Sequence, residues 1–351
     1  MQKIRIFYLD FIRAISIIAI VVSHFNSSIL SHSIIGHEIL IETYKNGDLG
    51  TMGVSLFFII SGSALMYTYN TDFSIKKFFK KRFLGIFPMF WIAYASAFLY
   101  MFYFNKTINH SIPKVNFILT ILGMDGYFLY KIPNFYILGE WFLGCIIFLY
   151  FCFPLLRKLV IERPKTTFAC IIVFYIIFVK KYNFEMPIVR NFLVRIPEFL
   201  AGMYFVQYIK NVKFYQFIAA LGVCTIMFLF SIKTDLIFRI TITGIALFFV
   251  LTYIAQYVKN KNMQNLFYVI SRYSFAVFLV HHVVIGQVVE RFRGVTISLP
   301  ETYCLFVFTC TIITILSVYL FKMSNKFNRF LGGLLNTNRH VYQNGEASIS
   351  E

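Results

Sequence analysis

The segment 303–321 reads YCLFVFTCTIITILSVYLF and contains no charged residue. A helix of about 20 apolar residues spans the roughly 30 Å hydrocarbon layer of a bilayer, so this segment predicts a transmembrane helix. The whole chain shares its character, because 59% of its 351 residues are hydrophobic and 14% are charged. Soluble domains are usually about 45–50% apolar and about 25% charged. The composition predicts an integral membrane protein and disfavours the alternative, a chain covered by a very large protein interface.

Nine further apolar runs accompany this segment. The ten predicted transmembrane helices cover residues 11–30, 50–69, 83–104, 138–156, 167–179, 192–208, 214–232, 236–258, 266–290 and 303–321. The fifth run is short, and residues 117–130 are a further candidate for a partial or re-entrant segment. We therefore predict an all-α membrane protein, a polytopic bundle of about ten transmembrane helices. Residues 1–335 would form one membrane domain, and residues 336–351 a polar, disordered cytoplasmic tail.

The basic residues predict how the chain is oriented. The net charge is +18, and the Lys and Arg residues form short clusters between the apolar runs. With ten crossings the loops alternate between two sides of the membrane, and 29 of the 33 Lys and Arg residues divide 19 to 10 between the sides. Because loops rich in Lys and Arg stay in the cytoplasm, both termini are predicted to be cytoplasmic. The clusters indicate topology and contact with anionic lipid, and no nucleic-acid partner.

Three ionisable residues of the first predicted helix fall on one stripe. They are Asp10, Arg13 and His24. A charge at membrane depth costs about 2.5–3.5 kcal/mol on insertion scales unless it faces a polar cavity. Arg13 and His24 are separated by about three helical turns, and Asp10 precedes Arg13 by about one turn, so the three share a face. We predict that they line a polar passage from the cytoplasmic surface, in which His24 acts as a general base near neutral pH.

Other ionisable residues also lie in apolar runs. Arg195 and Glu198 are three residues apart and fit a structural ion pair and a functional one equally. Adjacent His281 and His282 cannot share a helix face, so at most one is expected to line a cavity. The basic cluster at 76–82 fits lipid contact, or a dock for an anionic, phosphate-bearing donor. The six cysteines lie in apolar runs without a CxxC pair, which predicts buried thiols and no metal site.

Six segments form an ordered series of motifs. They are LDFIRAI at 9–15 followed by His24, which gives an R-x10-H pattern; GVSLFFIISG at 53–62; RFLGIFP at 82–88; WFL at 141–143 with Tyr150 and FPLL at 153–156; RIPEFLAGM at 195–203; and SFAVFLVH at 274–281. The series resembles the acyltransferase-3 family of bacterial integral membrane O-acyltransferases and covers nearly the whole chain. Two positions depart from the family pattern. Gly85 stands where many members have a second Arg, a role that Lys81 or Lys80 is expected to share, and Ile146 stands where many have a Glu.

The resemblance implies an O-acyltransferase of the bacterial inner membrane. Such an enzyme moves an acyl group, usually acetyl, from cytoplasmic acetyl-CoA or another acyl-CoA to a hydroxyl of a lipid-linked or cell-surface glycan, such as an O-antigen polysaccharide. No metal is expected. The expected catalytic residues are His24, as general base or acyl relay, with Arg13 and Asp10, and the expected donor-binding residues are Arg82, Lys81 and Arg195. Further candidates for the cavity or the acceptor site are Glu38, Glu42, Asp48, Glu140, Trp141 and His281.

Two other functions fit the composition. A flippase or transporter for a lipid-linked sugar would share the buried charges, but many transporters are built from inverted repeats, and no repeat is visible in this sequence. A glycan polymerase often carries a large outer loop, whereas the longest one predicted here covers residues 105–137. Loss of the gene should remove acyl groups from the glycan if the protein is a transferase, and should change chain length if it is a polymerase.

Overall fold

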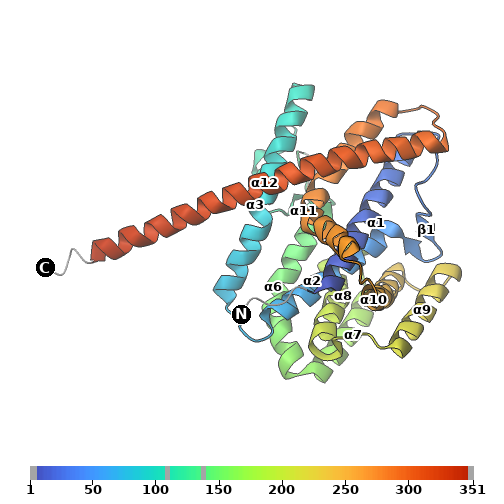
Figure 1. Ribbon diagram of the computed structural model, residues 1–351, viewed down its shortest axis with the longest axis horizontal. Coiled ribbons are helices and arrows are strands. Elements are labelled where there is room, and N and C mark those ends of the chain that lie inside the picture. Colours follow the sequence, from blue (N-terminus) through green and yellow to red (C-terminus); the bar gives the residue numbers. More distant parts are fainter. Residues whose placement is uncertain (1–5, 107–110, 136–139, 347–351) are drawn as a thin grey trace.

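The computed structural model describes residues 6–106, 111–135 and 140–346, and it is a bundle of helices (Figure 1). The twelve α-helices of these residues are α1 Phe7–Ser31, α2 Leu49–Tyr69, α3 Ile75–Asn105, α4 Phe117–Ile121, α5 Asp125–Phe128, α6 Glu140–Glu162, α7 Pro164–Lys180, α8 Phe192–Tyr204, α9 Phe214–Leu229, α10 Leu236–Ala255, α11 Lys261–Val289 and α12 Leu299–Glu346. The two strands of the same described ranges, β1 Thr43–Tyr44 and β2 Gly47–Asp48, form a short antiparallel hairpin. The predicted all-α membrane fold is confirmed.

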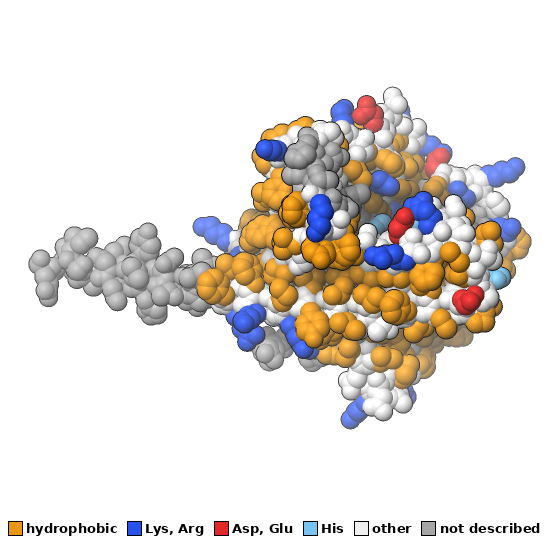
Figure 2. All heavy atoms as spheres, turned by 90° about the horizontal axis from the view of Figure 1, so that it is seen from above, with side chains coloured by type: hydrophobic (Ala, Val, Ile, Leu, Met, Phe, Trp, Pro, Cys, Tyr) orange, Lys and Arg blue, Asp and Glu red, His pale blue; other side chains and the backbone are white. Residues whose placement is uncertain are grey.

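Seven of the described helices are long and apolar enough to cross a membrane, namely α1, α2, α3, α6, α10, α11 and α12. The shorter helices α7, α8 and α9 coincide with the three remaining predicted runs. Each of the ten predicted runs therefore forms a helix. Hydrophobic side chains cover much of the surface in Figure 2, as a membrane-embedded surface requires.

The bounds of some elements differ from the prediction. Helix α3 begins at Ile75, so the basic cluster is part of the helix and not of a loop before it. Helix α8 ends at Tyr204 and continues as one π-helical turn, Phe205–Ile209. The candidate partial segment at 117–130 forms the two short helices α4 and α5, and α5 packs on α6. Helix α12 continues through Glu346 into the predicted tail, and the domain boundary at residue 335 stays a prediction.

Helix α2 lies at the centre of the bundle and contacts α1, α8 and α10. Its Gly62 lies against the backbone of α8, where a Cβ atom would overlap the carbonyl oxygen of Phe199. Reciprocally, a Cβ atom on Gly202 of α8 would overlap the carbonyl oxygen of Ile59. Small residues let membrane helices approach closely in this way. The two glycines therefore fix α8 tightly against α2, and α2 forms one wall of the site described below.

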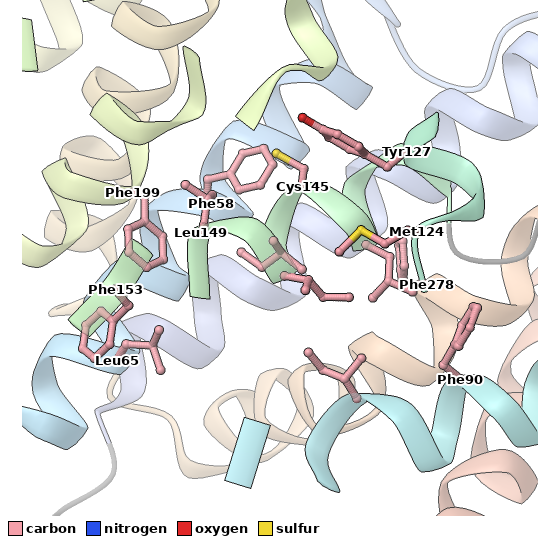
Figure 3. Packing of buried hydrophobic residues seen from close by; sticks show 14 of the residues in the cluster. Phe58, Leu65, Phe90, Met124, Tyr127, Cys145, Leu149, Phe153, Phe199 and Phe278 are labelled. Carbon is pink, nitrogen blue, oxygen red and sulfur yellow. The ribbon is translucent and has the colours of Figure 1, made fainter. Parts of the chain in front are cut away.

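Helix α6 is held against α2 and α8 by a cluster of large apolar side chains (Figure 3). Phe58 of α2 and Phe199 of α8 are fully buried in this cluster, together with Leu149 and Phe153 of α6. Phe153 also stacks on Phe78 near the start of α3, with ring centroids 5.1 Å apart. Buried side chains of this size contribute about 1.5–3 kcal/mol each. The cluster therefore sets the position of α6, which carries five of the residues that line the candidate site.

Candidate active site

A cavity of about 380 Å³ opens between α1, α2, α3, α6 and α11. Five of the residues predicted from the sequence line it: Arg13, His24, Asp48, Arg82 and Trp141. These residues come from four separate parts of the chain. The cavity volume lies within the range of about 300–1,000 Å³ that small-molecule sites usually occupy. The fold therefore brings five of the twelve predicted site residues to a single space inside the bundle.

The stripe on α1 faces this cavity. Arg13 and His24 both line it, and they are about 16 Å apart along the helix axis. Asp10 is buried behind them, where the Ser271 hydroxyl donates a hydrogen bond to its Oδ1 atom at 2.6 Å. The Arg13 guanidinium lies 3.7 Å from the same carboxylate and donates to Ser271 at 3.3 Å. Asp10 and Ser271 therefore position Arg13 and join α1 to α11.

Two histidines of α11 pack against His24. The ring centroids of His281 and His282 lie 5.1 Å and 4.6 Å from that of His24. His281 is fully buried, and its Nδ1 atom lies 2.8 Å from the carbonyl oxygen of Phe278. Because a carbonyl only accepts, Nδ1 carries a proton. Neither histidine lines the cavity, yet both contact His24, because residues about 100° apart on one helix can flank a ring that lies between them.

Arg82 is the basic-cluster residue at the cavity. Its guanidinium lies 5.8 Å from the ring centroid of Tyr150, another lining residue. Its buried Nε atom makes no hydrogen bond to any residue that the structure describes. Lys81 and Lys80 are exposed and do not line the cavity. Gly85, which does line it, has open space beside it, since a Cβ atom there would meet no atom within 4 Å.

The three candidate carboxylates between α1 and α2 differ in their relation to the cavity. Asp48 lines it and caps α2, because its Oδ1 atom accepts from the Thr51 backbone N–H at 2.7 Å. Glu42 accepts a hydrogen bond of 2.9 Å from Ser23, a lining residue, and partial burial raises the pKa of Glu42. Glu38 is exposed. Asp48 and Glu42 are therefore near the cavity, and Glu38 is outside it.

Arg195 is not at the cavity. It forms a fully buried ion pair with Glu198 at 3.0 Å, and Glu198 also accepts from Ser55 of α2 at 2.8 Å. A further hydrogen bond of 3.4 Å comes from Thr241 of α10. The guanidinium lies 5.6 Å from the ring of Trp141, so it supports the cavity wall from behind. Glu140 is the first residue of α6, and its side chain is outside the described part of the structure.

Sequence reasoning missed several residues of the site. Ser271, which holds Asp10 and Arg13, and Ser23, which contacts Glu42, carry no charge and stand out in no motif. Tyr150 was part of a motif but had no assigned role. His282 has no role in the sequence-based prediction, whereas its ring contacts His24 together with that of His281. Periodicity along α1 or α11 alone could not reveal these contacts, because each joins two different segments of the chain.

The fold and the cavity define a multi-pass membrane protein with a cationic and imidazole-bearing interior. The chain belongs to the acyltransferase-3 family, because the family model described as an acyltransferase domain matches residues 6–322. It is therefore a membrane acyltransferase. No curated protein and no solved structure shows a significant match to the chain.

Proposed function

We propose that the protein transfers an acyl group, most simply acetyl, from cytoplasmic acyl-CoA to a hydroxyl of a lipid-linked or cell-surface glycan. The observation that carries this proposal is the single cavity that contains Arg82 and Arg13, His24 and Asp48. The proposal places the protein in the bacterial inner membrane, with both termini in the cytoplasm. The donor then enters from the end near the basic cluster, and the acceptor from the end near Asp48.

The donor end of the cavity suits a phosphate-bearing molecule. Arg82 and Arg13 both line the cavity, and coenzyme A carries several phosphate charges. An arginine guanidinium binds phosphate oxygens through two parallel hydrogen bonds. A guanidinium at membrane depth is costly unless it faces a polar cavity or an opposite charge, which a bound phosphate would supply. Arg82 and Arg13 are therefore the proposed donor-binding residues, whereas exposed Lys81 and buried Arg195 lie outside the cavity.

His24 supplies the chemistry in this proposal. Its imidazole accepts the proton of the acceptor hydroxyl as the hydroxyl oxygen attacks the thioester carbonyl carbon. A C–O bond forms, the C–S bond breaks, and the coenzyme A thiolate leaves and takes up the proton. In the alternative route, an imidazole nitrogen attacks the thioester carbonyl carbon, the C–S bond breaks, and the thiolate leaves with the imidazole proton. The acceptor hydroxyl oxygen then attacks the acyl-imidazole, the C–N bond breaks, and the hydroxyl proton passes to the released imidazole. Both routes use a neutral imidazole at His24, which packs against the rings of His281 and His282.

A labelling experiment tests this function. Membrane vesicles that contain the protein are incubated with radiolabelled acetyl-CoA and a lipid-linked glycan, and label in the glycan is measured after extraction. We expect incorporation that depends on the protein, together with loss of acetyl groups from the surface glycan when the gene is removed. Unchanged acetylation with altered glycan chain length would instead identify a polymerase. Unchanged acetylation with a change in the membrane leaflet that holds the lipid-linked glycan would identify a flippase.

Arg82→Ala is expected to raise the KM for acyl-CoA by roughly tenfold or more, because it removes charge-assisted hydrogen bonds to phosphate. Arg82→Lys should give an intermediate KM, since lysine keeps the charge and loses the planar fork. The matched control is Lys81→Ala, because Lys81 is adjacent in sequence but exposed and away from the cavity. An unchanged KM in Arg82→Ala, measured by initial rates at varied donor concentration, would contradict the donor assignment.

The outer carboxylates give a second prediction. Asp48→Asn should lower turnover roughly tenfold, as expected for loss of one charge-assisted hydrogen bond to the acceptor or to His24. Asparagine caps a helix as well as aspartate does, so α2 should keep its stability. Glu38→Gln is the control, because Glu38 is exposed, and Glu42→Gln tests the residue that contacts Ser23. Full acylation by all three variants would remove these carboxylates from the mechanism.

A further inference from the structure

A second cavity, of about 580 Å³, lies between α3, α11 and α12. Helix α12 runs obliquely across α3 and α11 in Figure 1 and closes one side of this cavity. Because all three helices qualify as membrane spans, the cavity is a groove within the membrane-embedded part of the protein. We refer to it as the α3–α11–α12 groove.

The groove exists because the facing residues are too small to fill the space between the helices. Helix α3 contributes Ala93, Ser96 and Ala97, which recur at helical spacing on one face. Helix α11 contributes Val280 and Val284 on its facing side. Small residues usually let two helices close upon each other. Here α12 lies across both helices, and the space between them stays open.

One end of the groove is polar and the other is apolar. At the polar end the Tyr100 hydroxyl donates to the Gln287 carbonyl oxygen at 3.4 Å. Arg291, one turn beyond Gln287, also lines this end. The opposite end is lined by Leu316 and Leu320 of α12. A groove with this gradient matches a molecule that has a polar head and a hydrocarbon chain.

The charge of Arg291 is available to an anion. Glu290, the adjacent carboxylate, is already engaged by Arg293 at 2.7 Å and by His32 at 2.9 Å. Arg291 forms no ion pair with any described residue. A guanidinium in this position attracts a phosphate, and it can bind two phosphate oxygens at once.

The polar end of the groove is close to the mouth of the candidate active site. The Glu290–His32 pair joins the end of α11 to the end of α1, and Ser27, little more than one turn before His32, lines the active-site cavity. The two loops after these helices are joined as well, by the Ile35–Thr296 bridge. A head group held at Arg291 would therefore be within reach of the outer end of that cavity.

We propose that the α3–α11–α12 groove binds the hydrocarbon chain of a lipid phosphate that carries the acceptor glycan, with the phosphate on Arg291. This inference rests on the proposed function, because it identifies the acceptor as lipid-linked. The groove is one seam between three helices, which suits one hydrocarbon chain and favours a polyprenyl phosphate over a two-chain phospholipid. The glycan then extends over the outer end of α11 toward Asp48 and His24.

Photolabelling of the purified full-length protein tests this proposal. The probe is a polyprenyl monophosphate with a diazirine in its chain, added to protein in phosphatidylcholine nanodiscs. Ala97→Phe fills the groove and should abolish saturable labelling, and Arg291→Gln should weaken it roughly tenfold. The matched controls are Ala95→Phe, on the exposed side of α3, and Lys233→Gln, an exposed cation away from the groove; both should be labelled like the unmodified protein.

Competition identifies the occupant. Unlabelled polyprenyl phosphate should displace the probe, and phosphatidylglycerol should not. The proposal would be overturned if Ala97→Phe and Arg291→Gln were labelled as strongly as the unmodified protein. It would also be overturned if phosphatidylglycerol displaced the probe as well as polyprenyl phosphate does. A water-soluble glycan should be acylated by Ala97→Phe at an unchanged rate, because that variant leaves the active-site cavity intact. Saturable labelling without acyl transfer to any acceptor would instead reject the proposed function and leave the groove assignment standing.

Discussion

His24→Ala is expected to abolish acyl transfer, with turnover reduced by roughly 10²- to 10⁴-fold, which is the usual contribution of a general acid–base group. His24 lines the cavity that also contains Arg13 and Arg82, so its imidazole lies between the proposed donor and acceptor ends. The loss should appear in kcat, because the variant leaves the donor-binding arginines in place. The measurement is incorporation of label from acetyl-CoA in vesicles with matched amounts of inserted protein.

His37→Ala is the matched control for this experiment. His37 is exposed in the loop between α1 and α2 and does not line the cavity, so its loss should leave transfer unchanged. Turnover within a few-fold of normal in His24→Ala would reject His24 as base and as relay. Quenched reactions without acceptor distinguish these two roles. An acylated peptide that contains His24 indicates a relay. If no such peptide forms, although the same protein transfers the acyl group in a single turnover once acceptor is added, His24 acts as a general base.

Glu198→Ala is expected to lower the free energy of unfolding by about 3–5 kcal/mol. The substitution leaves the Arg195 guanidinium buried without its carboxylate, and it also removes the acceptor for Ser55 and Thr241. Removing one partner of a buried pair is far more costly than removing both. The double variant Arg195→Met with Glu198→Leu should therefore recover most of the lost stability. Thermal unfolding in a fixed detergent would measure both effects.

An exposed ion pair provides the comparison. Lys180 and Asp235 lie 2.6 Å apart with both side chains largely exposed, so Asp235→Ala should change stability little.

The double variant at the buried pair also decides the role of Arg195. An unchanged KM for acyl-CoA assigns Arg195 to the structure, and a raised KM would assign it to donor binding. A stable Glu198→Ala variant would contradict the buried-pair argument.

The transmembrane architecture could be predicted from the sequence because the bilayer imposes a strong and local rule. Backbone groups inside lipid must be satisfied within the segment, so each apolar run of sufficient length becomes a helix. The stripe of Asp10, Arg13 and His24 could be predicted for a similar reason, since the helical period fixes which residues share a face. Both predictions depend only on residues that are close together in the chain.

Contacts between helices could not be predicted in this way. The helical period does not say which neighbouring helix opposes a given face, or how far that helix is rotated about its own axis. The fold thus buries Arg195 with Glu198 behind the cavity and places His281 and His282 together around His24. The path of the chain between α1 and α2 likewise determines which carboxylate reaches the cavity, because it brings Asp48 there and leaves Glu38 exposed.

The sequence alone thus determined that the chain is a helical membrane protein with an ionisable stripe on its first span, because helix formation in lipid and helical periodicity act locally. The tertiary structure alone decided that Arg82, Trp141 and Asp48 meet that stripe in one cavity, and that small residues of α3 leave an open groove beside α11. These outcomes depend on side-chain volumes and glycine contacts between distant segments, which set the distances and rotations of whole helices.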